Sequence, residues 1–310
     1  MKDTRSDFKV GRNQKIFEEY AGTDTSFNKL AKKYDLSPQR VQMIVSDAKK
    51  KGLGRKLSSK SSKKDREQYK NRAVELRESG KLDFSMRMFD EVIAYDKENK
   101  NVCGLIDVMG HKRIVYSLMA DTEKDKAKRS EYLKDAAETT LAALQIAKKT
   151  PKEFLNHIYI LQIHLASVLI RQAESESGKK KQELLTKSLQ LLNDSAKNIK
   201  GSKAHKAWPM EKIAGVQYLL GKKDDSVKTL NQALEHIYEG YDEEMNGSDQ
   251  GRIKIKIWLN GILVRYAQIC VSEKKPLLAE IYASSVMNCP DADKVLVSMK
   301  RDAKKVLESF

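Results

Sequence analysis

Few residues of this chain have the types and spacing that catalysis or metal binding requires. The cysteines, Cys103, Cys270 and Cys289, lie far apart and have no cysteine or histidine at metal-ligand spacing. His157 and His164 are seven residues apart, two turns along one helical face, without further ligands. No Walker loop, GxSxG or HExxH motif occurs. We therefore expect a non-enzymatic protein without metal or cofactor.

Polar residues around position 40 have a different chemistry, because their side chains can read base edges. Gln pairs bidentately with adenine and Arg with guanine, so these residues could read DNA bases. The lysines near them would contact phosphates, which position a protein on DNA without specifying the sequence. The expected DNA contacts are Ser37, Gln39, Arg40, Gln42, Met43, Lys29, Lys32, Lys33, Lys49 and Lys50.

Three short helical patterns between residues 13 and 51 must position these side chains. The second pattern opens after Thr25, which is a competent N-cap. The third begins with Ser37 as a cap and Pro38 at the first helical position, where the missing N–H costs nothing. The residues expected to face inward are Ile16, Phe17, Tyr20, Phe27, Leu30, Ala31, Tyr34, Leu36, Val41, Ile44, Val45 and Ala48.

The segment LAKKYDLSPQRVQMIVSDAKKK, residues 30–51, resembles the helix-turn-helix of region four of primary sigma factors and of related phage and bacterial regulators. In those proteins a leucine-serine turn precedes a recognition helix. The resemblance implies that residues 37–43 enter the major groove of DNA. The alternative is that these helices are the first, irregular part of the helical array that follows.

The net charge of +16 is concentrated at the N-terminus. Residues 1–64 hold 17 Lys and Arg against 7 Asp and Glu, a net charge of +10. This asymmetry predicts a polyanion-binding arm, whereas the alternative is a solvated surface that only aids solubility. Gly, Ser and Lys dominate residues 52–64, which predicts a flexible basic tether. The expected domains are a helix-turn-helix at 1–53, a linker at 54–65 and repeats at 66–310.

From residue 65 onward helix follows helix, and two stretches repeat each other. Residues 78–99 and 219–237 align Gly80 with Gly221, about four periods of 34 residues apart. Both stretches resemble the tetratricopeptide repeat, whose glycine closes the turn between helices A and B while small residues allow close crossing. A third candidate, residues 276–294, keeps the helix B spacing but lacks the turn glycine.

The whole pattern predicts an all-α fold: an N-terminal three-helix helix-turn-helix joined to an α-solenoid of about five tetratricopeptide-like helix pairs. Residues 102–149 and 151–199 are expected to form two longer pairs, and 291–310 a C-terminal capping helix. The concave surface of such a solenoid binds extended peptides or partner helices. Candidate groove residues, each of which could instead be a packing residue, are Lys70, Arg77, His157, Gln162, Trp208, Tyr218, Asn260 and Arg265.

This architecture is similar to that of the RRNPP family of peptide-sensing regulators. In that family the repeats bind a short signalling peptide and mediate dimerisation, and the peptide changes how two DNA-binding heads are held. The resemblance implies double-stranded DNA, a short peptide or partner protein in the repeat groove, and a second copy of the chain as partners. One departure is the head, which is closer to the sigma-like type than to the larger repressor-type head usual in that family.

The expected function is therefore DNA-binding transcriptional regulation. The alternative is a non-enzymatic tetratricopeptide scaffold whose basic N-terminus docks RNA or another protein. The odd number of scattered cysteines fits a reducing, cytoplasmic compartment. No apolar run appears to approach the roughly 18 residues that span a bilayer, and the N-terminus lacks a signal-peptide pattern, so no membrane contact is expected.

Overall fold

A computed structural model describes residues 12–13, 15–17, 19–20, 25–50, 57, 61–247, 250–292 and 295–309, with the backbone alone at 48–50 and 151. Within these ranges the chain forms helices and their connections, without a strand. The protein divides into two compact units, Met1–Val108 and Met109–Phe310, and each is described by itself. The division falls inside α6 (Val102–Thr122). Most of the predicted tether lies outside the described residues.

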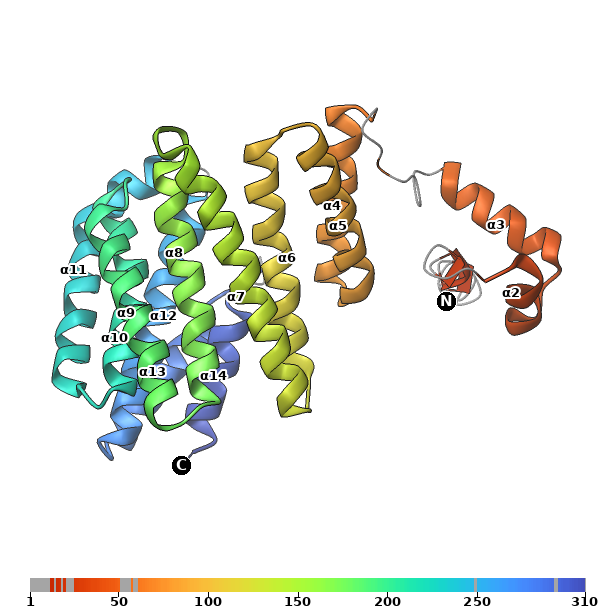
Figure 1. Cartoon of the computed structure of the whole chain (residues 1–310). Coiled ribbons are helices and arrows are strands. Elements are labelled where there is room, and N and C mark those ends of the chain that lie inside the picture. Colours follow the sequence, from red (N-terminus) through yellow and green to blue (C-terminus); the bar gives the residue numbers. More distant parts are fainter. Residues whose placement is uncertain are drawn as a thin grey trace. The chain divides into compact units, whose positions relative to one another are not determined.

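In the first unit, α2 (Phe27–Tyr34) and α3 (Pro38–Lys50) pack against each other (Figure 1). Asp35, between them, has a left-handed backbone with φ of 52°, and Leu36 donates its N–H to the carbonyl of Ala31 at 2.9 Å. The helices therefore meet through a tight turn, as the sequence predicted. The core that joins them to the residues before them comprises Ile16, Phe17, Leu30, Ala31, Val41, Ile44 and Val45, with Tyr20, Phe27, Tyr34 and Leu36 at its edge.

The start of α2 corrects one detail of the sequence prediction. The N-cap is Ser26 rather than Thr25, because Ser26 has the extended backbone of a cap and its Oγ accepts the N–H of Lys29 at 3.4 Å. The third helix begins as predicted, since Ser37 accepts the N–H of Arg40 at 3.1 Å and α3 starts at Pro38. Ala48, expected to face inward, lies where only the backbone is described.

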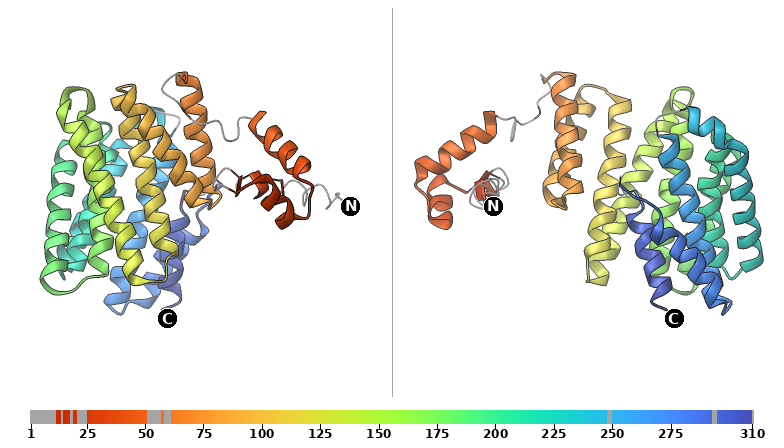
Figure 2. Two further views of the ribbon diagram at one scale, coloured as in Figure 1. Left: turned by 45° about the vertical axis from the view of Figure 1, so that its right-hand side comes forward. Right: turned by 180° about the vertical axis from the view of Figure 1, so that it is seen from behind.

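The array begins in the first unit with α4 (Lys63–Glu78) and α5 (Leu82–Glu98), an antiparallel pair. The second unit continues it, and each helix from α7 to α14 packs on the next (Figures 1 and 2). The described chain is thus an all-α, solenoid-like succession of helices. The bounds are α6 Val102–Thr122, α7 Lys126–Lys149, α8 Pro151–Glu174, α9 Gly178–Asn198, η1 Lys203–Lys206, α10 Ala207–Leu219, α11 Lys223–Gly247, α12 Gly251–Ser272, α13 Pro276–Asn288 and α14 Val297–Leu307.

Two helix pairs 141 residues apart turn in the same way. Gly80 between α4 and α5 has φ of 76°, and Gly221 between α10 and α11 has φ of 78°. In each turn the residue after the glycine donates its N–H to the carbonyl five residues earlier, at 2.8 Å and 2.9 Å. Glycine is favoured here because left-handed backbone places Cβ too close to the following carbonyl oxygen in other residues.

The same two pairs also cross in the same way. The Ser85 hydroxyl donates to the carbonyl of Ala73 at 2.8 Å, and the Ser226 hydroxyl donates to that of Ala214 at 2.8 Å. All four residues are completely buried. A small side chain on each helix lets the backbones approach closely enough for this bond. The repeated alignment seen in the sequence therefore corresponds to repeated local geometry.

A third turn has this geometry without a glycine. Lys274, between α12 and α13, has φ of 56°, and Lys275 donates its N–H to the carbonyl of Cys270 at 2.9 Å. Ala267 and Ala279, both fully buried, replace the alanine and serine of the other crossings. The missing glycine had suggested a departure from the pattern. The structure instead places a lysine in the left-handed conformation.

The predicted pairs over 102–149 and 151–199 are present as α6 with α7 and α8 with α9. The terminal helix is shorter than the predicted 291–310, since α14 starts at Val297. The backbone N–H groups of Val295 and Leu296 are instead bonded to the Asp291 carboxylate. α14 packs on α12 and α13 through Ala303 and Val306.

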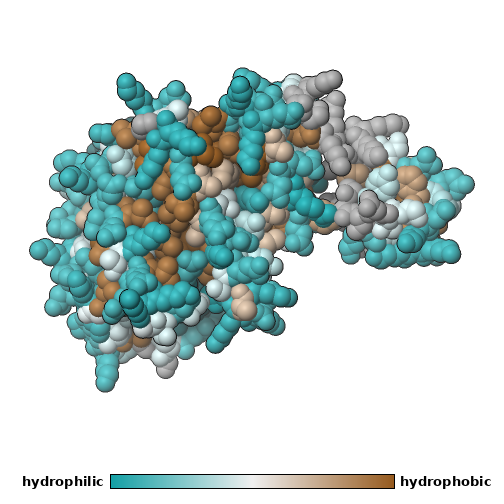
Figure 3. Space-filling view, in the orientation of Figure 1, coloured by the Kyte–Doolittle hydropathy of each residue, from teal (hydrophilic) through white to brown (hydrophobic). Residues whose placement is uncertain are grey.

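One helix is long and apolar enough to cross a membrane, contrary to the expectation from the sequence. It is the Lys152–Glu174 part of α8, and half of its apolar window is buried inside the fold. α8 packs between α7 and α9, which accounts for its composition. A band of apolar side chains across α8 also reaches the surface seen in Figure 3, bordered by polar groups. The arrangement is compatible with a soluble protein.

Candidate functional site

The predicted base-reading residues share the exposed side of α3. Gln39, Arg40 and Gln42 are exposed, and Met43 has 53% of its surface accessible. The opposite side of the helix is buried against α2 and the residues before it. The 3.6-residue period of the helix separates the two faces, and the cap at Ser37 sets where the exposed face begins. The side chains therefore project from a packed support.

The predicted phosphate contacts differ from one another in their environment. Lys29 and Lys32 are exposed on α2. Lys33 instead binds both carboxylate oxygens of Glu19 at 2.9 Å, and the Tyr34 hydroxyl donates to the same carboxylate at 2.8 Å. These two hydrogen bonds lower the pKa of Glu19. Lys33 thus ties α2 to the preceding helical residues, a role that its position in the sequence did not suggest.

Two further predicted contacts, Lys49 and Lys50, belong to α3, but their side chains lie outside the described part of the chain. With Lys33 engaged by Glu19, the described cations available to a phosphate are Lys29 and Lys32 on α2 and Arg40 on α3. All three belong to the two helices of the tight turn.

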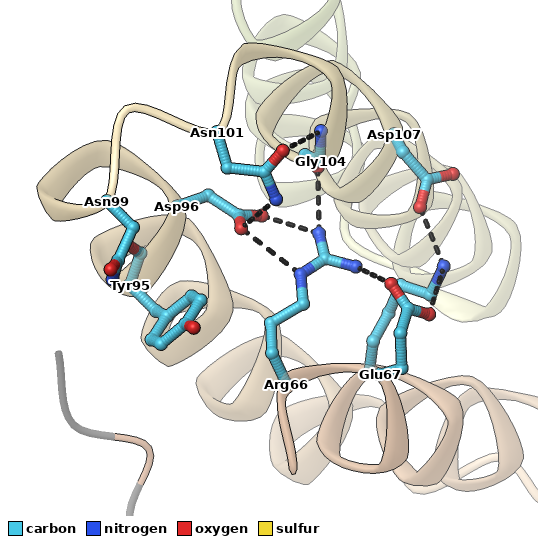
Figure 4. A network of polar contacts seen from close by, with 9 residues as sticks. Arg66, Glu67, Tyr95, Asp96, Asn99, Asn101, Gly104 and Asp107 are labelled. Atoms are coloured by element: carbon cyan, nitrogen blue, oxygen red, sulfur yellow. Dashed lines mark hydrogen bonds and ion pairs between the residues drawn. The ribbon is translucent and has the colours of Figure 1, made fainter. Parts of the chain in front are cut away.

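The array is anchored where it begins by a buried polar network around Arg66 (Figure 4). Arg66 donates Nε–H and Nη2–H to the two oxygens of Asp96, on α5, and Nη2 also to the carbonyl of Gly104, on α6. Asn101 donates to Asp96 at 2.7 Å. Arg66 and Asp96 are almost fully buried. The network therefore joins α4 to the turn between α5 and α6.

The start of α4 is fixed as well. Ser62 and Asp65 form a capping box, and the Tyr95 hydroxyl on α5 donates to the carbonyl of Ser61 at 2.9 Å. These contacts immobilise the point at which the chain from residues 1–60 enters the array. Sequence reasoning missed this anchor, because an arginine on a polar helix looks like a solvated residue until its buried partner is known.

The two groove candidates of the first unit are both ion-paired. Lys70 contacts Glu67 and Asp107 at 3.1 and 2.8 Å, and Arg77 contacts Glu78 at 3.3 Å. Lys70 extends the network of Figure 4. We therefore assign Lys70 a role in joining α4 to α6 rather than in holding a ligand.

Two candidates of the second unit are buried rather than directed into a groove. Gln162 is 5% exposed and donates to Asp194 of α9 at 2.7 Å. Asn260 is 3% exposed and donates to the carbonyl of Lys256 at 2.8 Å. Both were predicted as groove residues from their position on the first helix of a pair. They lie instead on the sides that pack against neighbouring helices.

The remaining candidates lie on α8, α10 and α12. His157 is exposed on α8 and contacts the Phe154 ring, while Trp208 is half-buried on α10. Tyr218 on α10 donates to the carbonyl of Gln268 at 3.5 Å. Arg265 on α12 donates to the Gln268 amide oxygen at 2.7 Å and to Glu211 at 3.3 Å. The structure thus joins α10 and α12 through predicted groove residues and through partners that had not been predicted.

The Arg265 side chain occupies a space that a glycine leaves open. A Cβ at Gly215, in the middle of α10, would lie 2.9 Å from the Arg265 guanidinium carbon. Glu211, a turn earlier on α10, is 5% exposed and also binds Lys212 at 2.7 Å. Burial raises the pKa of Glu211, but Lys212 and Arg265 together outweigh it and lower the pKa. A glycine inside a helix is a sequence signal that could have indicated this close contact.

His164 faces Trp208 edge-on, with ring centroids 5.3 Å apart. Burial, together with the positive charges of Arg113 and Lys212, lowers the pKa of His164 to about 3. The imidazole is therefore neutral at physiological pH.

A second polar cluster had no counterpart in the sequence prediction. The Ser202 hydroxyl donates to Glu244 at 2.7 Å, His205 Nδ1 lies 3.0 Å from the same carboxylate, and Lys254 binds its other oxygen at 2.8 Å. Burial lowers the pKa of His205 more than Glu244 raises it. Because one carboxylate oxygen receives both groups, Ser202 is not aligned for activation by the histidine. The cluster fastens η1 to α11 and α12.

The cysteines do not come together: Cys270 is buried, Cys103 exposed and Cys289 half-buried. Among the described residues no group of three His, Cys, Asp or Glu side chains is arranged to hold a metal ion. No protein-family model matches the chain, and no curated protein matches it significantly.

Proposed function

We propose that the protein is a DNA-binding transcriptional regulator whose N-terminal head is a helix-turn-helix. The observation that carries this proposal is the exposed face of α3. Gln39, Arg40, Gln42 and Met43 project from the start of a helix whose other face is packed on α2. A recognition helix requires this combination, because its first turns contact base edges while the rest of the head holds its orientation.

The proposal assigns the helical array to the tetratricopeptide type. Support comes from the turns at Gly80, Gly221 and Lys274, which share one hydrogen-bond pattern. In this role the array binds a short peptide or a partner protein and pairs two copies of the chain. Three free cysteines are consistent with a cytoplasmic location.

The DNA-binding role is tested by selecting bound sequences from a random duplex pool and then measuring mobility shifts. Arg40→Ala should weaken binding by about 1–3 kcal/mol and relax selectivity at one base position, because Arg reads a guanine through two hydrogen bonds. Lys32→Ala is the matched control. It should weaken binding about equally on every duplex, since a phosphate contact carries no sequence information.

The outcome that would contradict the proposal is equally specific. If no sequence is enriched, and Arg40→Ala and Lys32→Ala reduce binding to duplex DNA and RNA alike, the basic head is a general docking arm. That result would favour a scaffold that binds RNA or another protein.

A further inference from the structure

The second unit has charged side chains directed to a common region from non-consecutive helices. α8, α10, α12 and α14 neighbour one another in that order. Asp121, at the end of α6, contacts Arg171 of α8 at 2.6 Å and Arg301 of α14 at 3.7 Å. The first and last helices of this unit therefore meet, and the right-hand view of Figure 2 shows α14 (dark blue) beside α6. We call the region around Asp121, Arg129, Arg171, Glu174 and Arg265 the inner face.

Two cations of the inner face have donors that are not satisfied. The Nε–H groups of Arg129 and Arg265 are buried, and neither has a hydrogen-bond partner among the described residues. Arg265 is held in place by Glu211 and Gln268 through its other two nitrogens. Arg129, on α7, makes no ion pair within the described part of the chain. A buried guanidinium donor without a partner is costly, and an external carboxylate would satisfy it.

A carboxylate already lies nearby. Glu174 feels the positive charges of Arg171, Arg265 and Arg129, and the negative charge of Asp302. Burial is nevertheless the largest influence and raises its pKa. Within the described residues Glu174 makes no hydrogen bond or ion pair of its own. It is placed to compete with an incoming anion for the same arginines.

An aromatic surface continues from this charged region along α8 and α10. His164 lies two turns before Arg171 on α8, and Trp208 lies two turns before Gly215, over which Arg265 is packed. Because His164 is neutral, this end of the inner face suits an apolar group. A ligand that combines a carboxylate with an apolar side chain matches both parts, and an extended peptide supplies the two at this spacing.

We propose that the inner face binds an acidic peptide, whose carboxylate is held by Arg129 and Arg265 and opposed by Glu174. This proposal rests on the ligand-binding role of the repeat array and names the chemistry of its ligand. Cations outnumber carboxylates on this face when Arg301 and Lys212 are included with their partners. Charge complementarity therefore favours an anionic occupant over a basic one.

The experiment measures fluorescence anisotropy of a labelled hexaglutamate peptide on the full-length protein at low salt. Arg129→Gln should weaken binding about threefold, as expected for one partly screened charge, and Glu174→Gln should strengthen it by a similar factor. Arg129 has no partner to lose in the folded protein, so its variant should melt at the wild-type temperature. Opposite effects of the two variants distinguish a site from a general change of net charge.

Two lysine variants serve as matched controls. Lys179→Gln removes a cation that is 91% exposed on α9, and Lys32→Gln removes one from the basic head. Neither should change the affinity for hexaglutamate. If Lys32→Gln weakens binding and Arg129→Gln does not, the peptide binds the head and the proposal is wrong. Binding of inorganic phosphate that depends on Arg129, without binding of hexaglutamate, would also overturn the peptide assignment.

The same variants separate this proposal from the proposed function. Arg129→Gln and Glu174→Gln should leave the mobility shift of selected duplex DNA unchanged. Wild-type protein that selects no DNA but shows both effects on hexaglutamate would refute the regulator and retain the inner-face site. The reverse result would refute only the site.

Discussion

At the scale of single residues, the Arg66–Asp96 pair is where the polar chemistry matters most for stability. Asp96→Ala would leave the Arg66 guanidinium buried without its main partner. Breaking one side of a buried pair costs about 3–5 kcal/mol, because the remaining charge has lost its solvation and gains nothing in return. Urea unfolding followed by circular dichroism should show this loss for the transition of the first unit.

The control for this prediction is Glu78→Gln, which removes the partner of Arg77 at a position 66% exposed. An exposed pair contributes at most about 1 kcal/mol. Similar losses in the two variants would mean that the Arg66 network is hydrated and contributes no more than a surface pair.

His164 makes the stability of the second unit depend on pH. Its pKa in the folded protein is lowered to about 3, so the unfolded chain takes up a proton near pH 6.5 while the folded chain does not. Stability from the neutral imidazole is therefore present above pH 6.5 and is lost as the pH falls toward 3. Between pH 7 and pH 5 the wild type should lose about 1–2 kcal/mol more than His164→Gln does.

Urea unfolding at the two pH values measures this difference. Other titrating groups, including His205, are common to both proteins and cancel in the comparison. Equal pH dependence in the wild type and the variant would show that His164 is protonated as freely in the folded protein as in the unfolded chain.

At the scale of elements, the left-handed turn between α12 and α13 is open to improvement. Lys274 has φ of 56°, a conformation that costs a residue with a side chain about 1–2 kcal/mol. Lys274→Gly should stabilise the second unit by about 0.5–1 kcal/mol, since glycine's greater freedom in the unfolded chain offsets part of the gain. Gly221→Ala, at the equivalent turn between α10 and α11, should destabilise it by about 1 kcal/mol.

Thermal melts of the two variants test this pair of effects. Because a Cβ at Gly221 meets no atom within 4 Å, the loss on substitution there reports backbone conformation and not a clash. The same sign of change in both variants would mean that the two turns are not equivalent.

The elements themselves were largely predictable from local chemistry. Ser37 followed by Pro38 marked the start of α3, and the glycines at 80 and 221 marked two helix-pair turns. The start of α2 was displaced by one residue, because Thr25 and Ser26 are both acceptable caps and only the backbone decides between them. The turn at Lys274 was not predictable, since lysine rarely adopts this conformation and the hydrogen bonds of the turn impose it here.

At the scale of the whole molecule, the proposed regulator is a dimer, whose mass should be twice the chain's 35.3 kDa. Multi-angle light scattering of the full-length protein measures this directly. The DNA sequences selected from a random pool should then be palindromic, because two symmetric heads read two symmetric half-sites. A monomeric mass together with a single, non-palindromic site would contradict the dimer and leave DNA binding intact.

The sequence by itself determined the class of the fold and the exposed face of α3. Both depend on local rules: helical periodicity separates apolar from polar faces, and caps and glycines mark helix ends. Only the tertiary structure decided which polar residues are engaged with one another. Lys33 and Lys70 looked available, yet Glu19 and Asp107 bind them from 14 and 37 residues away. Such partners depend on how helices pack, and this packing also leaves the Nε–H groups of Arg129 and Arg265 without partners on the inner face.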